Sequence, residues 1–132
     1  MKIDIIHYRD MNKSQLYDAL SLRAQVFVVE QTCPYQDVDY KDQEAWHVFI
    51  YENSQLNAYL RIIEPEKEVI WIGRVVVREN ERGRELGKKA MIQALHFCSQ
   101  EYPNIPIKIS AQSHLQDYYS LLGFVPYGSG YL

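Results

Sequence analysis

The chain has 132 residues and a mass of 15.6 kDa, with 47% apolar and 23% charged residues. This apolar content excludes a disordered chain, and one domain of this size buries roughly two-thirds of its unfolded surface. No apolar run approaches the ~18–20 residues of a membrane-spanning helix. The N-terminal stretch 1–8 is too short and too polar for a signal peptide, so we expect one cytoplasmic domain over residues 1–132.

The charge balance excludes a surface with a general attraction for polyanions. Fourteen Lys and Arg stand against 17 Asp and Glu, a net charge of −3, so we expect neither a nucleic acid nor a membrane as partner. An anionic ligand must then be held by a local basic patch. The two cysteines, Cys33 and Cys98, are too few for a disulfide framework and lack the spacing of metal ligands.

Hydrophobic periodicity predicts an alternation of strands and helices around one sheet. In chain order we expect a strand at 2–8, a helix at 12–27, strands at 47–51, 56–63 and 69–78, a helix at 82–102, a strand at 107–110, a short helix at 114–122 and a strand from 124. Asn12 or Ser14 is placed to cap the first helix. Gly73 interrupts a β-branched run and indicates a bulge or a close backbone approach.

The strongest functional motif is the passage from the strand at 69–78 into the helix that follows. A helix N-terminus offers free N–H groups and a positive dipole end, and glycines let a phosphate approach the backbone. The passage is rich in basic side chains: Arg78, Arg82, Arg84, Lys88 and Lys89. It lacks the Walker and dinucleotide-binding patterns. An ordinary solvated first turn of a helix is an equally good explanation of this motif taken alone.

The motif resembles the acetyl-CoA-binding segment of the GNAT superfamily of N-acetyltransferases, R/Q-x-x-G-x-G/A, with Arg82 and Gly87 in register. The segment 119–124, Tyr-Ser-Leu-Leu-Gly-Phe, resembles the family's Y-x-x-x-G-F. Three further stretches, 22–31, 33–39 and 111–115, are similar to the ElaA-like branch. The resemblance spans almost the whole chain. It implies a GNAT-like mixed α/β fold with a mostly antiparallel sheet flanked by helices, in the order β-α-β-β-β-α-β-α-β.

By this resemblance, the backbones of Val75 and Val77 bond the pantetheine arm and the segment from Arg82 to Lys88 holds the pyrophosphate. The implied cofactor-binding residues are Val75, Val77, Arg82, Gly83, Arg84, Gly87 and Lys88. Glu85 departs from the pattern, because it occupies the fourth position, where the family has glycine. An acid in the first turn of a helix complements the dipole, and we expect Glu85 to point outward and leave its amide for the phosphate.

Tyr119 matches the family tyrosine that protonates the departing CoA thiolate. A phenol with a pKa near 10 remains protonated at neutral pH and can donate to sulfur. An amine acceptor must lose a proton before it attacks, and His114, Glu30 and His47 are candidates for the base, with His114 ranked first. Each histidine is equally explained as a satisfied polar residue.

Residues 31–45 form a long acidic loop, and loops of this length in a compact domain are often functional. Its aspartates do not fit a calcium-binding loop, because Lys41 and Val48 occupy ligand positions. We expect either a solvated turn or an acidic wall that faces a cationic amine. The candidate substrate-binding residues are Glu30, Tyr35, Asp37, Asp39 and His47.

The sequence therefore predicts an acyl-CoA-dependent N-acetyltransferase that moves an acetyl group from acetyl-CoA directly to a primary amine of a small molecule or peptide. Acetyl-CoA is a co-substrate, no metal is expected, and the protein is a monomer or homodimer. The alternative is a degenerate GNAT-like domain that binds CoA or a protein without catalysis. A metal-dependent hydrolase, suggested by the aspartates alone, is a third possibility.

Overall fold

A computed structural model describes residues 1–34, 36–66, 68–110, 126–127 and 130–131. The strands are β1 (Lys2–His7), β2 (Ala45–Glu52), β3 (Gln55–Glu66), β4 (Val69–Val77), β5 (Ile107–Ser110), β6 (Pro126–Tyr127) and β7 (Gly130–Tyr131). The two α-helices in this part of the chain are α1 (Lys13–Arg23) and α2 (Leu86–Glu101). Shorter helical segments are η1 (Tyr8–Asp10), the π-helical η2 (Ala24–Glu30), η3 (Asp42–Glu44) and η4 (Glu79–Glu81).

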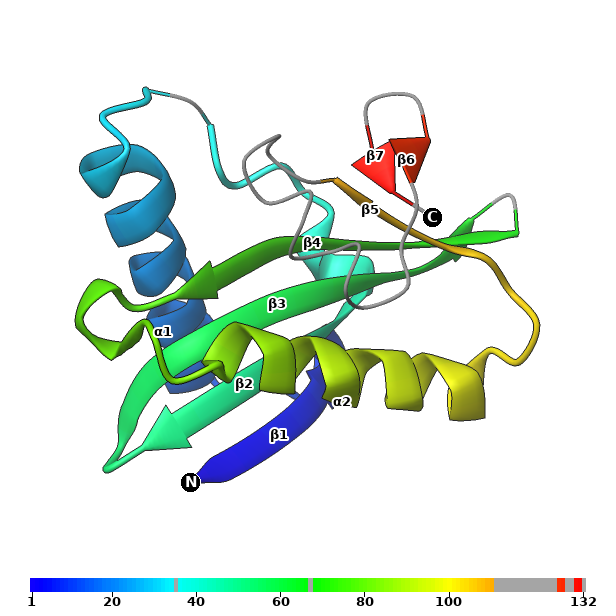
Figure 1. Cartoon of the computed structure of the whole chain (residues 1–132), viewed down its shortest axis with the longest axis horizontal. Coiled ribbons are helices and arrows are strands. Elements are labelled where there is room, and N and C mark those ends of the chain that lie inside the picture. The colour runs from blue at the N-terminus through cyan, green and yellow to red at the C-terminus, as the bar shows by residue number, and fades with distance from the viewer. Residues whose placement is uncertain (35, 67, 111–125, 128–129, 132) are drawn as a thin grey trace.

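The strands form one sheet in the order β1-β2-β3-β4-β5-β7-β6. Among the described strands only β4 and β5 pair in parallel, and the other neighbours are antiparallel. The two helices cover opposite faces of the sheet (Figure 1): Val48 and its α2-facing neighbours form one core, and Phe49 packs with α1 in the other. This arrangement confirms the predicted mixed, mostly antiparallel sheet flanked by helices.

Local side-chain chemistry explains where the helices begin. Asn12 caps α1 in a reciprocal capping box with Gln15, which decides between the two predicted caps. The second helix begins at Leu86, four residues later than predicted, because Gly83 and Glu85 adopt left-handed backbone angles, φ +88° and +60°, that stop a helix from forming earlier. The helix predicted at 114–122 and the strand start predicted at 124 lie outside the described residues.

A bulge divides β4 into two halves. Arg61 pairs with Gly73 and Tyr59 pairs with Val76, so two residues of β4 stand opposite one residue of β3. Arg74 within the bulge has a φ of +53°. The extra residue shifts the alternation of side chains, because Ile70, Ile72, Val75 and Val77 all pack in the α2 core while Val76 packs in the α1 core. The bulge that Gly73 predicted is therefore present.

Three arginines and three aspartates attach the long loop after η2 to the sheet. Their charges are equal in number, and the six side chains are Arg23, Arg61, Arg74, Asp37, Asp39 and Asp42. Arg23, at the end of α1, is 1% exposed and bonds Asp37 and Asp42, each at 2.8 Å. Because removing one partner would leave a buried charge unpaired, this network fixes the position of the loop.

His47 lies beneath this network and is buried. Its Nε2 is 2.9 Å from the backbone oxygen of Asp42 and its Nδ1 is 2.6 Å from the hydroxyl of Tyr59. Since a carbonyl only accepts, Nε2 carries the proton and the Tyr59 hydroxyl donates to Nδ1. Burial is the main reason that the pKa of His47 falls to about 4, so this imidazole is neutral at pH 7.

Protonation of His47 predicts a loss of stability in mild acid. In the unfolded chain its pKa is about 6.5, so the unfolded state takes up the proton first as the pH falls. The stabilisation is complete above pH 6.5 and is lost progressively toward pH 4. We expect the free energy of unfolding, measured by denaturant titration, to fall by about 2 kcal/mol between pH 7 and pH 5. His47→Gln should flatten this dependence, and an equal slope in both proteins contradicts the assignment.

Candidate functional site

The second half of β4 has an edge that no described strand pairs with, called the open edge below. β4 pairs with β5 only over Ile70–Ile72, and no other described strand pairs with that side of residues 73–77. The backbone N–H of Arg78 donates to Asn57 of β3 at 2.8 Å. Because successive residues of a strand turn their backbone groups to opposite sides, Val75 and Val77 turn theirs to the open edge. These are the two residues whose backbones were predicted to bond the pantetheine arm.

The N-terminus of α2 follows this edge after η4 and a short turn, and it lies at the same end of the sheet (Figure 1). The carbonyl of Glu85 accepts the helix bond from Lys89 at 3.0 Å, and no side chain of the described residues is hydrogen-bonded to this helix start as a cap. The N–H groups of Leu86, Gly87 and Lys88 therefore have no helical acceptor. Uncapped donors at the positive end of a 16-residue helix suit an anion such as a diphosphate.

The left-handed backbone of Glu85 explains why this position of the motif favours glycine. A φ of +60° is unfavourable for a residue with a β-carbon and costs glycine nothing. The Glu85 side chain is exposed, which confirms that it points outward. Gly83, at φ +88°, occupies a second left-handed position two residues earlier. The left-handed backbone is therefore present at this position although the residue is glutamate rather than glycine.

Arg82 forms a bridge from this turn to the end of η2 and to β4. Its guanidinium donates to both carboxylate oxygens of Glu30, at 2.6 and 2.9 Å, and twice to the backbone oxygen of Val77, at 3.2 and 3.1 Å. The hydrogen bonds to Glu30 are the main reason that the pKa of Arg82 is raised. Glu30 is 52 positions away in the sequence, and periodicity contains no information on such a partner.

Arg84 is also paired with acids. Its two terminal nitrogens bond the two carboxylate oxygens of Glu52, at the end of β2, and one of them also bonds Glu81 at 2.6 Å. These hydrogen bonds raise the pKa of the Arg84 guanidinium and lower the pKa of Glu52 to about 2. The predicted basic patch thus contains two arginines that already have carboxylate partners.

The predicted substrate-binding residues fall into different environments. Asp37 and Asp39 belong to the arginine–aspartate network, His47 is buried beneath it, and Glu30 holds Arg82. The prediction of a solvated turn is wrong for Asp37, which is 8% exposed. The prediction of an acidic wall did not include the arginines that pair with its aspartates. These arginines are basic residues within largely apolar segments of the sequence. That placement is the signal that could have revealed the network. Tyr35, His114 and Tyr119 lie outside the described residues.

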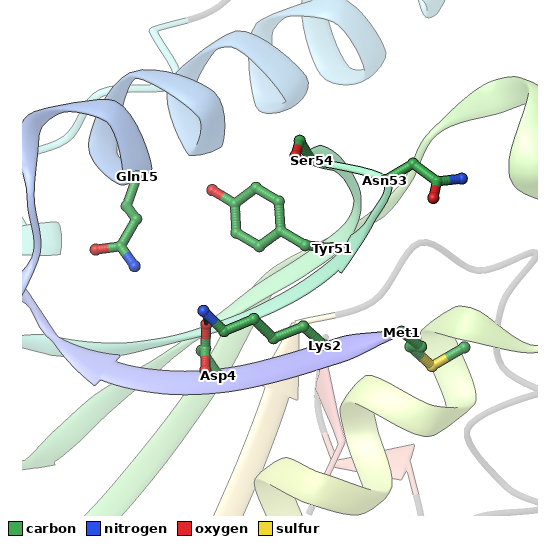
Figure 2. Close-up of a pocket in the computed structure, with 7 residues that line it drawn as sticks. All are labelled: Met1, Lys2, Asp4, Gln15, Tyr51, Asn53 and Ser54. Carbon is green, nitrogen blue, oxygen red and sulfur yellow. Dashed lines mark ion pairs between the residues drawn. The ribbon is translucent and has the colours of Figure 1, made fainter.

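A separate hollow of about 450 Å³ lies between β1, the start of α1 and the turn from β2 to β3. Figure 2 shows the ring of Tyr51 directed into it, with Lys2 and Asp4, an ion pair at 3.5 Å, on the β1 side. The Tyr51 hydroxyl donates to Asp18 at 2.9 Å. The residues that line this hollow are Met1, Lys2, Asp4, Gln15, Tyr51, Asn53 and Ser54. It contains none of the predicted catalytic, cofactor-binding or substrate-binding residues.

Within the described ranges, no three His, Cys, Asp or Glu side chains gather as a possible metal site. In the same part of the chain, every helix is too short or too polar to cross a bilayer.

Comparison with known proteins gives the same family at the levels of sequence and structure. The profile of the Acetyltransferase (GNAT) domain matches residues 9–131. Protein ElaA of Escherichia coli is 41% identical over 125 residues, which cover 92% of this chain and 82% of ElaA. The crystal structure of E. coli ElaA superposes with a TM-score of 0.92 at 38% identity, over 98% of this chain and 95% of that one.

A second solved structure extends the similarity to an enzyme. An acyl-CoA N-acyltransferase from Pseudomonas aeruginosa superposes with a TM-score of 0.90 at 40% identity, over 95% of this chain and 87% of that one. The matches cover the open edge of β4, the turn from Arg82 to Glu85 and α2 together. The chain therefore belongs to the GNAT family of acyl-CoA-dependent acetyltransferases, in the branch that contains ElaA.

Proposed function

We propose that this enzyme transfers an acetyl group from acetyl-CoA directly to a primary amine of a small molecule or peptide. The observation that carries the proposal is the open edge of β4, which ends beside an uncapped helix N-terminus. One extended ligand can pair with the first and place an anionic group at the second. Acetyl-CoA has both parts, a pantetheine arm with amide groups and a diphosphate.

In the proposed complex, the pantetheine amides pair with the backbone of Val75 and Val77 as an added strand does. The diphosphate accepts hydrogen bonds from the first-turn amides of α2, including those of Gly87 and Lys88. Gly83 provides the left-handed turn before the helix, and Arg82 and Arg84 supply positive charge around it. The exposed side chain of Lys88 adds a further charge to the same end of the helix.

The chemistry proposed is attack of a neutral amine on the thioester carbon. Backbone N–H groups of β4 polarise the carbonyl as negative charge develops on its oxygen. The C–N bond forms, the C–S bond breaks, and the CoA thiolate takes the phenolic proton of Tyr119. The proton that the attacking nitrogen loses as it becomes an amide restores the Tyr119 phenol. His114 is our candidate for the base that receives the proton of the acceptor ammonium. Both residues lie outside the described part of the chain, and their roles rest on the family motif.

A binding and turnover experiment tests the function as a whole. We expect calorimetry to detect CoA binding to the wild-type protein, and we expect thiol release from acetyl-CoA when a panel of primary amines is added. Tertiary amines serve as the control, because they cannot form a stable amide. Absence of binding at millimolar CoA contradicts the proposal.

Replacement of Tyr119 tests the general acid. We expect Tyr119→Phe to lower kcat by about 10²-fold, with little change in the KM for acetyl-CoA, because the phenol acts on the leaving group rather than on binding. Tyr118→Phe is the matched control, since it removes the neighbouring phenol. An unchanged kcat in Tyr119→Phe removes the proposed role.

Replacement of Glu85 tests whether the turn is already shaped for the diphosphate. Glu85→Gly relieves a left-handed non-glycine residue, so we expect the free energy of unfolding to rise by about 0.5–1 kcal/mol. Glu85→Ala removes the same charge but keeps the β-carbon, and it should give no such gain. The two variants should have similar affinities for CoA, because both lack the carboxylate. Equal stabilities of the two variants, measured by denaturant unfolding, speak against strain at this position.

A further inference from the structure

Arg82 connects the two sides of the proposed active site through one guanidinium. On one side it binds Glu30, the last residue of η2, from which the acidic loop continues. On the other it binds the carbonyl of Val77, at the open edge of β4. The same nitrogen, Nη2, donates to Glu30 at 2.9 Å and to Val77 at 3.1 Å, so the carboxylate and the carbonyl lie close together.

Each group that Arg82 engages has a second use in the proposed function. The Val77 carbonyl belongs to the edge proposed to pair with pantetheine, and Arg82 itself belongs to the turn proposed to hold the diphosphate. Glu30 carries the negative charge that a protonated amine requires. With Arg82 in its present position, the guanidinium, the carboxylate and the carbonyl each use part of their hydrogen-bonding capacity within this bridge.

The bridge can open at low energetic cost, in contrast to the arginine–aspartate network. The Arg82 and Glu30 side chains are 42% and 24% exposed, and ion pairs of this kind contribute little to stability. A diphosphate offers more negative charge and more acceptor oxygens than one carboxylate, and it suits the planar fork of a guanidinium. Arg23, by contrast, is 1% exposed and is paired with both Asp37 and Asp42.

We propose that Arg82 is exchanged between Glu30 and the CoA diphosphate, so that cofactor binding opens the acceptor site. This inference rests on the proposed function. When CoA binds, the guanidinium turns from Glu30 and Val77 to the diphosphate. The Val77 carbonyl then becomes free for pantetheine, and the Glu30 carboxylate becomes free as the counter-charge of a protonated amine acceptor. Because binding couplings are reciprocal, an ammonium acceptor bound at Glu30 also strengthens CoA binding.

The test measures CoA affinity by calorimetry in four proteins: wild type, Glu30→Gln, Arg82→Gln and the double variant. Glu30→Gln removes the competitor for Arg82, so we expect it to bind CoA about two- to fivefold more tightly than wild type. In the Arg82→Gln background the same substitution should have no effect, because there is no guanidinium to release. This cycle isolates the coupling from the separate effect of each residue.

Glu52→Gln is the matched control for charge. It removes one carboxylate that pairs with an arginine of the same turn, but Arg84 keeps Glu81 as a partner, so the gain in affinity should be smaller than in Glu30→Gln. In turnover assays with an amine that the wild type accepts, Glu30→Gln should raise the KM for the amine even though CoA binds more tightly. A general loss of folded protein cannot move the two constants in opposite directions.

Three outcomes overturn the proposal. The first is that Glu30→Gln binds CoA no more tightly than wild type. The second is an equal gain in affinity with and without Arg82, and the third is a gain no larger than that of Glu52→Gln. In each case, if the wild-type protein binds CoA, the exchange is contradicted but the proposed function is not. If neither wild type nor Glu30→Gln binds CoA, the proposed function and the exchange fall together.

Discussion

One extra residue in β4, next to Gly73, changes which side of the strand faces each neighbour. Before the bulge, Ile70 bonds toward the β5 side, and after it Val75 and Val77 turn to that side. A regular strand would instead turn Val76 there and bury a different set of side chains beneath α2. The bulge therefore determines which residues turn their backbone groups to the open edge and which side chains pack beneath α2. The proposed CoA site depends on it.

The side chain of Arg74, in the bulge, is held by the acidic loop. Its Nε is 2.8 Å from Asp37, and its Nη2 donates to the backbone oxygen of Asp37 at 3.0 Å. Asp37 in turn is held by the buried Arg23. The acidic loop and β4 are thus joined through Arg74 and Asp37, and in the proposed exchange the partly exposed bridge of Arg82 is the contact that opens.

Local chemistry made part of this structure predictable from sequence. Strand and helix periods predicted the element order as far as β5, and Gly73 indicated the bulge. The start of α2 was misplaced because Glu85 takes a backbone angle that its side chain disfavours. The pairs Arg82–Glu30 and Arg61–Asp39 join residues 52 and 22 positions apart, and only the folded sheet brings them together. The aspartates of the acidic loop were therefore predicted to carry free negative charge, whereas in the structure arginines pair with them.

The central claim is that CoA lies along the open edge of β4 and ends at α2. The most direct measurement follows backbone amide resonances by NMR while acetyl-CoA is added to the isotopically labelled protein. The account predicts the largest shifts at Val75, Val77 and the first-turn amides of Leu86, Gly87 and Lys88. Shifts confined to the hollow around Tyr51, with the amides of β4 and α2 unchanged, would contradict it.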